Sequence, residues 1–343
     1  MALLNIEGFD DLASADVNTA GYSVQGSTPT MVAGRFGGQA AQFDLSTQNG
    51  VTYACAEQGI THGAAIRLDE AHSTAENTSP RLLAIASTTP NRCLIGVIYN
   101  TASQVLSLAA RSTLSSGTTV ASTTPGAVNI PVGVYVYMEL SYDPVQEAAV
   151  VRLNGEVVLA VGSGANPYSR AMAGTSVAWG DGASPLGVTV DDWYTNEGYL
   201  QWKGECKVVT RYPTSDTAAQ DLTPSSGSDH YAMVDENPQD GDVTYVEGED
   251  AGATDRYASS DDIGNPDTIH AVAVRSIMKK TDVDSKTARN VVRSGSSTSN
   301  GPTETMTTSY SGYMSIHETN PNGGAEWTAP AVEASEFGVQ IVS

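Results

Sequence analysis

The sequence predicts an all-β protein, with a jelly-roll sandwich followed by a second, smaller β-sandwich domain. Residues 134–142 alternate between apolar and polar side chains, which is the pattern of a half-buried antiparallel strand. Short β-rich runs, separated by clusters of Gly, Ser, Thr, Asn and Pro, recur at intervals of ~8–12 residues, as in sandwiches and barrels. Before residue 198 the sequence contains no amphipathic helix of useful length.

The strand at 134–142 opens a predicted strand–turn–strand series. One face carries apolar side chains and the other carries mostly polar ones: Val134, Val136, Met138 and Leu140 against Tyr135, Tyr137, Glu139 and Ser141. After the turn DPVQ, strands are expected at 147–153 and 156–161. Asn154-Gly155 between them is the strongest short hairpin signal, because a type I′ turn needs positive φ at both central residues.

Other strands of the first half follow the same pattern. They are expected at 64–68, 81–87, 93–100 and 104–112. The extended segments NIEGFDDL and VTVDDWYTNEG, near the two ends of this half, are expected to pair or to lie side by side. In GRFGGQAAQFD the glycines predict a tight turn between core strands, with Phe36 and Phe43 as anchors in the core.

The second half predicts further strands and one helical turn. Strands are expected in ECKVVTRYPT, on both sides of the acidic turn in DHYAMVDENPQDGDVTYVEGED, in DTIHAVAVRSIMKK, in ARNVVRS and in GYMSIHETNP. A helical turn with Thr328 as its cap precedes a final strand. The composition shift near Gly198 places the domains at 1–198 and 199–343.

Composition excludes several classes of function. The formal net charge is −22, from 17 Lys and Arg against 39 Asp and Glu, which argues against nucleic acid as a partner. No apolar run approaches the ~20 residues of a membrane helix, so no membrane insertion is expected. The N-terminus lacks the pattern of a signal peptide. Three widely spaced cysteines give neither a disulfide framework nor a zinc motif.

Several quoted segments resemble a known family. EGFDDL, GRFGGQAAQFD, YMELSYDPVQEAAVVRLNGEVV and VDDWYTNEG together resemble the laminin-G-like, concanavalin-A-like jelly-roll domains of tailed-bacteriophage structural proteins, over residues 1–198. GECKVVTRYPTSD, DHYAMVDENPQDGDVTYVE, TIHAVAVRSIMKK and EWTAPAVEASEFGVQIV resemble a C-terminal β-domain that often follows such jelly rolls. The resemblance implies a non-enzymatic virion surface protein: a capsid decoration, neck or tail-attached component that binds other virion proteins.

The same resemblance implies a homo-oligomer, with a trimer favoured. Host attachment through a surface polysaccharide is expected if the jelly roll presents an aromatic platform beside polar side chains. Tyr168, Trp179, Trp193 and Tyr194 are the candidate platform, because they follow the Asn154-Gly155 hairpin in or beside loops. Core or rim packing is the favoured interpretation of any one of them. The alternatives to the virion interpretation are a lectin-like adhesin and a polysaccharide-degrading tail protein.

Catalytic residues are not expected. Glycosidases of the concanavalin-A-like class resemble one another in acidic residues alternating along one strand, because two carboxylates must face the cleft ~5–5.5 Å apart. Here Asp191 and Asp192 are adjacent, so in a regular strand they point to opposite faces. The sequence contains no GxSxG elbow, P-loop or HExxH motif.

One acidic loop is a candidate Ca²⁺ site. Asp235, Asp240 and Asp242 lie in the stretch DENPQDGDVTYVEGED, and calcium prefers clustered carboxylates on a turn. The spacing does not fit an EF-hand, since Gly241 comes one place late and Val246 stands where the bidentate Glu belongs. A solvated acidic loop is therefore the favoured interpretation, Ca²⁺ is the alternative, and no other cofactor is expected.

Overall fold

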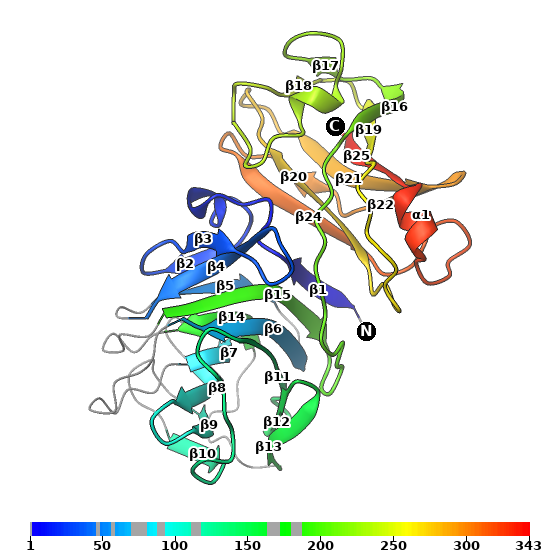
Figure 1. Cartoon of the computed structure of the whole chain (residues 1–343). Coiled ribbons are helices and arrows are strands. Elements are labelled where there is room, and N and C mark those ends of the chain that lie inside the picture. Colours follow the sequence, from blue (N-terminus) through cyan, green and yellow to red (C-terminus); the bar gives the residue numbers. More distant parts are fainter. Residues whose placement is uncertain are drawn as a thin grey trace. The chain divides into compact units, whose positions relative to one another are not determined.

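The computed structural model of the chain describes residues 2–45, 49–55, 59–69, 81–87, 93–110, 118–162, 172–179 and 187–343. It is built almost wholly of antiparallel β-strands (Figure 1). The prediction of an all-β protein is therefore confirmed. The chain divides into two compact units: residues 1–10 with 22–208, and residues 11–21 with 209–343.

This division differs from the boundary expected at 198/199. Residues 199–208 belong to the first unit, so the division falls ten residues later than predicted. Residues 11–21 belong to the second unit, although they lie near the N-terminus. A composition shift marks neither feature, because both depend on contacts with residues far away in the sequence.

The first unit is a sandwich of two antiparallel sheets. The eight-stranded sheet has the order β13 (Glu156–Val161), β12 (Ala148–Leu153), β11 (Tyr135–Asp143), β6 (Ile60–Leu68), β15 (Gly187–Glu197), β4 (Gln39–Asp44) and β3 (Thr30–Ala33), with β1 (Leu3–Glu7) paired to β15. The seven-stranded sheet has the order β10 (Thr118–Ser122), β9 (Val105–Ala110), β8 (Cys93–Asn100), β7 (Arg81–Ser87), β14 (Met172–Trp179), β5 (Gly50–Ala54) and β2 (Ser23–Gln25).

The core of the first unit lies between these sheets. Alternate residues of the central strands, such as Ile66, Leu140 and Val190, are fully buried on the inner face. The hydroxyls of Thr175 in β14 and Thr195 in β15 are 3.0 Å apart, which ties the two layers directly. Period-two alternation therefore identifies the inner face correctly.

Two local predictions of the first half are confirmed. Asn154 and Gly155 have φ of 47° and 85°, as a type I′ turn requires, and the turn joins β12 to β13. The segments at the two ends of this half also pair, since β1 runs antiparallel to β15 with Ile6 opposite Tyr194.

Three predictions about the first unit and the segment after it are wrong. Val134 lies outside β11 and is 51% exposed, while β11 is buried on both faces. Phe43 is in the core, but Phe36 is 55% exposed at the tip of its turn. The segment ECKVVTRYPT is not a strand, and β16 begins only at Ser215; the N–H groups of Val208 and Tyr212 in this segment bond to side chains.

The second unit is a smaller sandwich. Its six-stranded sheet has the order β16 (Ser215–Gln220), β19 (Thr254–Ala258), β25 (Glu336–Ile341), β21 (Thr287–Ser294) and β22 (Ser297–Asn300), with β23 (Glu304–Thr305) paired to β21. Two smaller sheets consist of β20 (Val272–Met278) with β24 (Ser311–His317), and β17 (Thr223–Pro224) with β18 (Val246–Glu247). The short helices are η1 (Ser14–Asp16), η2 (Tyr231–Met233) and α1 (Ala329–Glu333).

The core of the second unit is small. Val274, Val292, Trp327 and Val332 pack together, and Val332 is supplied by α1. The strand expected at DHYAMV is wrong, because this segment forms the helical turn η2. The helical turn and final strand expected at the C-terminus are confirmed as α1 and β25. Among the described residues no helix is long and apolar enough to cross a membrane.

Candidate functional site

The outer face of the eight-stranded sheet carries a row of polar side chains. We call it the polar face and define it by eleven outer-face residues: Thr61, Gly63 and Arg67 of β6, Tyr135, Tyr137, Glu139 and Ser141 of β11, and Thr189, Asp191, Asp192 and Tyr194 of β15. Most of them are buried, although an outer face is ordinarily open to water.

Residues 199–208, which we call the strap, explain this burial. The strap crosses the polar face with its main chain, and side chains of the face accept its N–H groups. The bonds are Leu200 N to Ser141 Oγ (2.7 Å), Gln201 N to Thr61 Oγ1 (2.9 Å), Lys203 N to Tyr194 Oη (3.1 Å), Gly204 N to Glu139 Oε1 (3.0 Å) and Val208 N to Asp192 Oδ1 (2.7 Å). The side chains of the polar face thus take the place of a neighbouring strand, because they accept the strap N–H groups that a strand's carbonyl oxygens would otherwise accept.

Glu139 is the central acceptor under the strap. Its side chain is 1% exposed, and its Oε1 also accepts the hydroxyl of Tyr194 at 2.5 Å. Arg152 of β12 lies 3.4 Å from Oε2 and supplies the opposite charge. Burial, followed by the nearby Glu139 carboxylate, raises the pKa of Tyr194 far above its ordinary value, so this phenol stays protonated as a donor.

Asp191 and Asp192 do not point to opposite faces, so that prediction is wrong. A bulge shifts the register of β15 between Asp191 and Tyr194, and Asp192 adopts a φ of 50°. Both carboxylates then contact Arg35: its backbone N–H donates to Asp191 at 2.7 Å, and its guanidinium lies 3.5 Å from Asp192. Burial, followed by the Asp192 charge, raises the pKa of Asp191 to about 7.

Beyond the strap, Arg67 and Tyr135 of the polar face are partly exposed among the described residues, and we call this part of the face the open end. Arg67 Nε donates to Asp69 Oδ1 at 2.7 Å, and the other carboxylate oxygen of Asp69 accepts Thr189 Oγ1 at 2.7 Å and Gln42 Nε2 at 3.1 Å. The Arg67 guanidinium lies 5.0 Å from the ring centroid of Tyr135. This arrangement places an aromatic ring beside a carboxylate, a guanidinium and an amide, all on one sheet surface.

Among the described residues of the open end, the hydroxyl of Tyr135 makes no hydrogen bond. The residue is half-buried, and its hydroxyl oxygen is buried. Burial raises its pKa to about 12, and the Arg67 charge lowers it in part. Arg67 and Asp69 were not among the predicted site residues, although a charged residue inside the apolar run AAIRL is a signal that could have identified Arg67.

The predicted glycan platform is not assembled. Trp193 is fully buried and Tyr194 is 3% exposed, so neither ring presents a face to solvent. Trp193 instead packs in the core, with its ring 5.6 Å from that of Tyr22. Tyr168 lies outside the described residues, as does the side chain of Trp179.

The predicted Ca²⁺ ligands do not converge on one point. Asp240 accepts the hydroxyl of Thr244 at 2.8 Å, and Asp242 is paired with Lys279 at 2.5 Å, while Asp235 is exposed. The bond from Lys279 lowers the pKa of Asp242. Among the described residues no three His, Cys, Asp or Glu side chains are grouped so that they could hold a metal ion.

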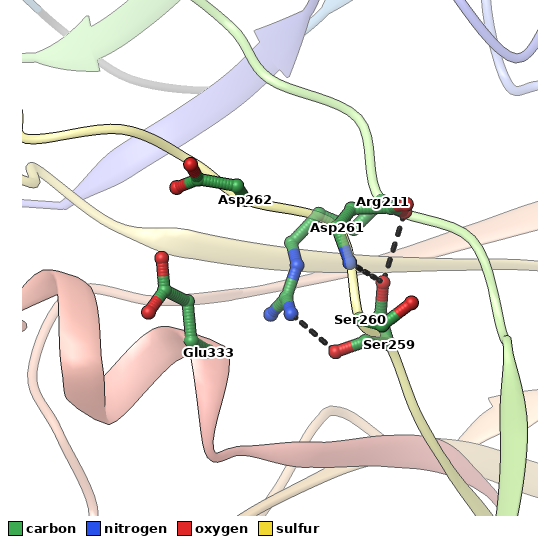
Figure 2. A pocket seen from close by; sticks show the side chains of 6 residues that line it. All are labelled: Arg211, Ser259, Ser260, Asp261, Asp262 and Glu333. Atoms are coloured by element: carbon green, nitrogen blue, oxygen red, sulfur yellow. Dashed lines mark hydrogen bonds between the residues drawn. The ribbon is translucent and has the colours of Figure 1, made fainter.

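The second unit contains a polar pocket of about 380 Å³ (Figure 2). Ser260 and three acidic side chains, Asp261, Asp262 and Glu333, line it with Arg211 and Ser259. Arg211 donates to the carbonyl oxygens of Val332 at 2.7 Å and Ser259 at 2.6 Å, so its guanidinium holds the pocket wall. These bonds give Arg211 a structural task, and the sequence analysis gave this place no role.

Comparisons with protein-family models and with curated proteins return no match. Similar solved structures include the carbohydrate binding module CBM66 from Bacillus subtilis, at 9% identity and a TM-score of 0.37, covering 52% of this chain and 98% of that chain. Domain 4 of AbnA, a GH43 extracellular arabinanase from Geobacillus stearothermophilus in complex with arabinotriose, has 18% identity and a TM-score of 0.42, covering 58% and 94%.

The carbohydrate recognition domain of Emp47p is also similar, at 8% identity and a TM-score of 0.36, covering 52% of this chain and 89% of that chain. At these values the likeness adds nothing to the sandwich that the strand pairing already defines. Function must therefore be argued from the residues of the polar face.

Proposed function

We propose that the chain is a non-enzymatic protein whose first unit binds glycan at the open end of the polar face. The observation that carries this proposal is the position of Tyr135 beside Arg67 and Asp69. Sugars present an apolar C–H face together with hydroxyl groups, so they need an aromatic ring with a few placed polar groups around it. The Arg67 guanidinium and the Asp69 carboxylate are the polar groups placed beside this ring.

The bonding of the carboxylates supports a binding role over a catalytic one. Glu139 and Asp192 accept main-chain N–H groups of the strap, and Asp69 accepts three side-chain donors. A glycosidase needs two carboxylates that both face the same glycosidic bond. A carboxylate already engaged in this way orients its neighbours, and its oxygens are not placed to attack or protonate a substrate.

The experiment is a glycan-array screen of the whole chain, followed by calorimetric titration of the best ligand. Tyr135→Ala is expected to weaken binding by at least about tenfold, as removal of an aromatic anchor does. Tyr245→Ala, in the second unit, is the matched control and should bind as the wild type does. Equal binding by the Tyr135 variant would remove the open end as the site, and release of reducing sugar would show an enzyme instead.

The setting that we propose is the surface of a tailed-phage virion, where the chain acts as a structural and host-attachment protein. The support is the resemblance of the segments quoted from residues 1–198 and of those from the second half. The expected assembly is a homo-oligomer, with a trimer favoured, bound to other virion proteins. Immunogold labelling of particles tests this setting, since gold on the head or on the tail would place the protein there. An absence of gold from all particles would favour the lectin-like adhesin.

A further inference from the structure

Phe36 is exposed in a way that packing does not explain. It stands at the tip of the turn between β3 and β4, and 55% of its surface is open. Among the described residues it is the only aromatic side chain with more than about a third of its surface exposed. A single exposed aromatic side chain is common on protein surfaces, but the support and the surroundings of this ring are not.

The turn that carries the ring is fixed on both sides. The Arg35 N–H donates to Asp191 at 2.7 Å, and the Gln39 N–H donates to Asp10 at 2.6 Å. Gly38, between them, has a φ of 67°, and a Cβ there would lie 1.9 Å from the Asp10 carboxylate, so no side chain fits. A ring held by such a turn is already ordered before any ligand arrives, which lowers the entropy cost of binding.

Two cations lie near the ring, and they differ in whether a carboxylate pairs with them. The Arg35 guanidinium lies 4.5 Å from the centroid of Phe36, and it is paired with Asp192 and Glu205. The Lys207 ammonium, from the strap, lies 5.3 Å from the same centroid. Lys207 is exposed, and in the described part of the chain no carboxylate oxygen lies within 4.0 Å of it.

This combination selects a ligand class. A fixed, exposed ring suits the C–H face of a sugar, and an unpaired ammonium about 5 Å from the ring centroid suits a carboxylate on the same sugar. We propose that Phe36 and Lys207 form a subsite for a uronate residue of an acidic polysaccharide. The inference rests on the proposed glycan binding by the first unit and names the class of sugar that it takes.

Neighbouring alternatives fit less well. A neutral sugar would leave the Lys207 ammonium without a partner. A nucleic acid would bring a run of phosphates toward a chain of net charge −22, and the one exposed ammonium at this ring could neutralise only one of them. A single carboxylate per bound sugar matches the one exposed ammonium beside this ring.

The experiment titrates the whole chain with tetramers of galacturonate, mannuronate, guluronate and glucuronate, and with the carboxyl-reduced counterpart of each. Lys207→Gln is expected to weaken binding of the acidic tetramers by about tenfold, or ~1.4 kcal/mol, and to leave the reduced tetramers within about twofold. Phe36→Ala is expected to weaken binding of both forms by about tenfold. Both side chains are exposed, so both variants should keep the melting temperature of the wild type, which is measured alongside.

Lys286→Gln, in the second unit, is the control for general charge effects. If it weakens binding of the acidic tetramers as much as Lys207→Gln does, the subsite is overturned, because net charge then explains the effect. If the wild type prefers the reduced tetramers, or if Lys207→Gln changes nothing, the subsite is overturned while glycan binding stands. If the wild type binds no tetramer and no glycan on the array, the proposed function fails together with the subsite.

Discussion

The inner and outer faces of the eight-stranded sheet are both buried, but by opposite chemistry. On the inner face, side chains such as Leu140 and Val190 are fully buried against the seven-stranded sheet. On the outer face, Glu139 and Tyr194 are 1% and 3% exposed beneath the main chain of the strap. The first face excludes water by apolar packing, while the second must satisfy each polar group that it desolvates.

The difference teaches that a polar strand face does not identify a solvent face. Acceptors spaced along the sheet can take up the N–H groups of a covering segment, and the covering segment in turn buries those acceptors. Each such bond contributes only ~0.5–1.5 kcal/mol net, but a missing partner costs ~1–3 kcal/mol. The strap and the polar face therefore depend on each other, and the predictions below test each side of that dependence.

The largest expected effect comes from the inner face. Leu140→Ala should lower the free energy of unfolding by about 2–5 kcal/mol, because it leaves a cavity at a fully buried position. Ser141→Ala, the next residue on the outer face, should lower it by about 1–2 kcal/mol through the lost bond to Leu200 N. Urea unfolding measures both, and Val157→Ala, at a 61% exposed site, is the control. A larger loss for Ser141→Ala would show that the strap contributes more than the core does.

The second effect depends on pH. His62 of β6 is fully buried, neither ring nitrogen has a partner among the described residues, and burial lowers its pKa to about 3. The unfolded chain binds this proton below pH ~6.5, whereas the folded chain does not, so stability falls as pH falls from ~6.5 toward 3. The slope is at most ~1.4 kcal/mol per pH unit. His62→Leu should remove this loss of stability at low pH, and thermal unfolding between pH 4 and 7 measures it.

Asp191 on the outer face acts in the opposite direction over nearly the same range. Its pKa is raised to about 7, so the folded chain holds a proton that the unfolded chain has lost, and stability falls as pH rises from ~4 to 7. Asp191→Asn should remove this contribution to the pH dependence. The free energy of unfolding of the variant should therefore rise relative to that of the wild type as pH rises. A wild-type profile that is unchanged in slope by both substitutions would contradict the burial of these two side chains.

Next in size is crowding under the strap. A Cβ on Gly63 would lie 2.7 Å from the Tyr194 ring and 2.9 Å from Glu139, so Gly63→Val should cost about 1–3 kcal/mol. It should also displace the strap and speed tryptic cleavage at Lys203 and Lys207. Gly162→Val is the matched control, because apart from its chain neighbours no atom of the described residues lies within 4 Å of a Cβ there. Cleavage at the wild-type rate in the Gly63 variant would show that the strap is not held by this face.

The fold was predictable because it follows from local patterns. The alternation of apolar and polar residues predicted the buried face that includes Leu140. The Asn154-Gly155 pair predicted the hairpin, and both residues have the positive φ that its turn requires. Each of these signals lies within a few residues of the element that it specifies. The same holds for the C-terminal helical turn at 329–333 and the strand that follows it.

The candidate site was much less predictable, because distant residues create it. The strap reaches Glu139 across 65 positions of sequence, and the bulge at Asp192 reverses the direction that a regular strand would give its side chain. Phe36 was expected in the core from its type alone, yet a pinned turn holds it outside. Trp193 was a candidate for the glycan platform, with core packing as the favoured interpretation, and the structure places it in the core.

The smallest expected effect concerns the exposed end of the Arg35 ion pairs. The Glu205 side chain is 54% exposed, whereas the Asp192 side chain on the same guanidinium is 3% exposed. Glu205→Gln should therefore change the free energy of unfolding by less than about 0.5 kcal/mol, since solvent screens exposed pairs. Because this substitution leaves Arg35 with one carboxylate partner fewer, it should also raise affinity for a uronate at Phe36. A loss above about 1 kcal/mol in urea unfolding would mean that the exposed Arg35–Glu205 pair, and not only the buried acceptors of the polar face, holds the strap in place.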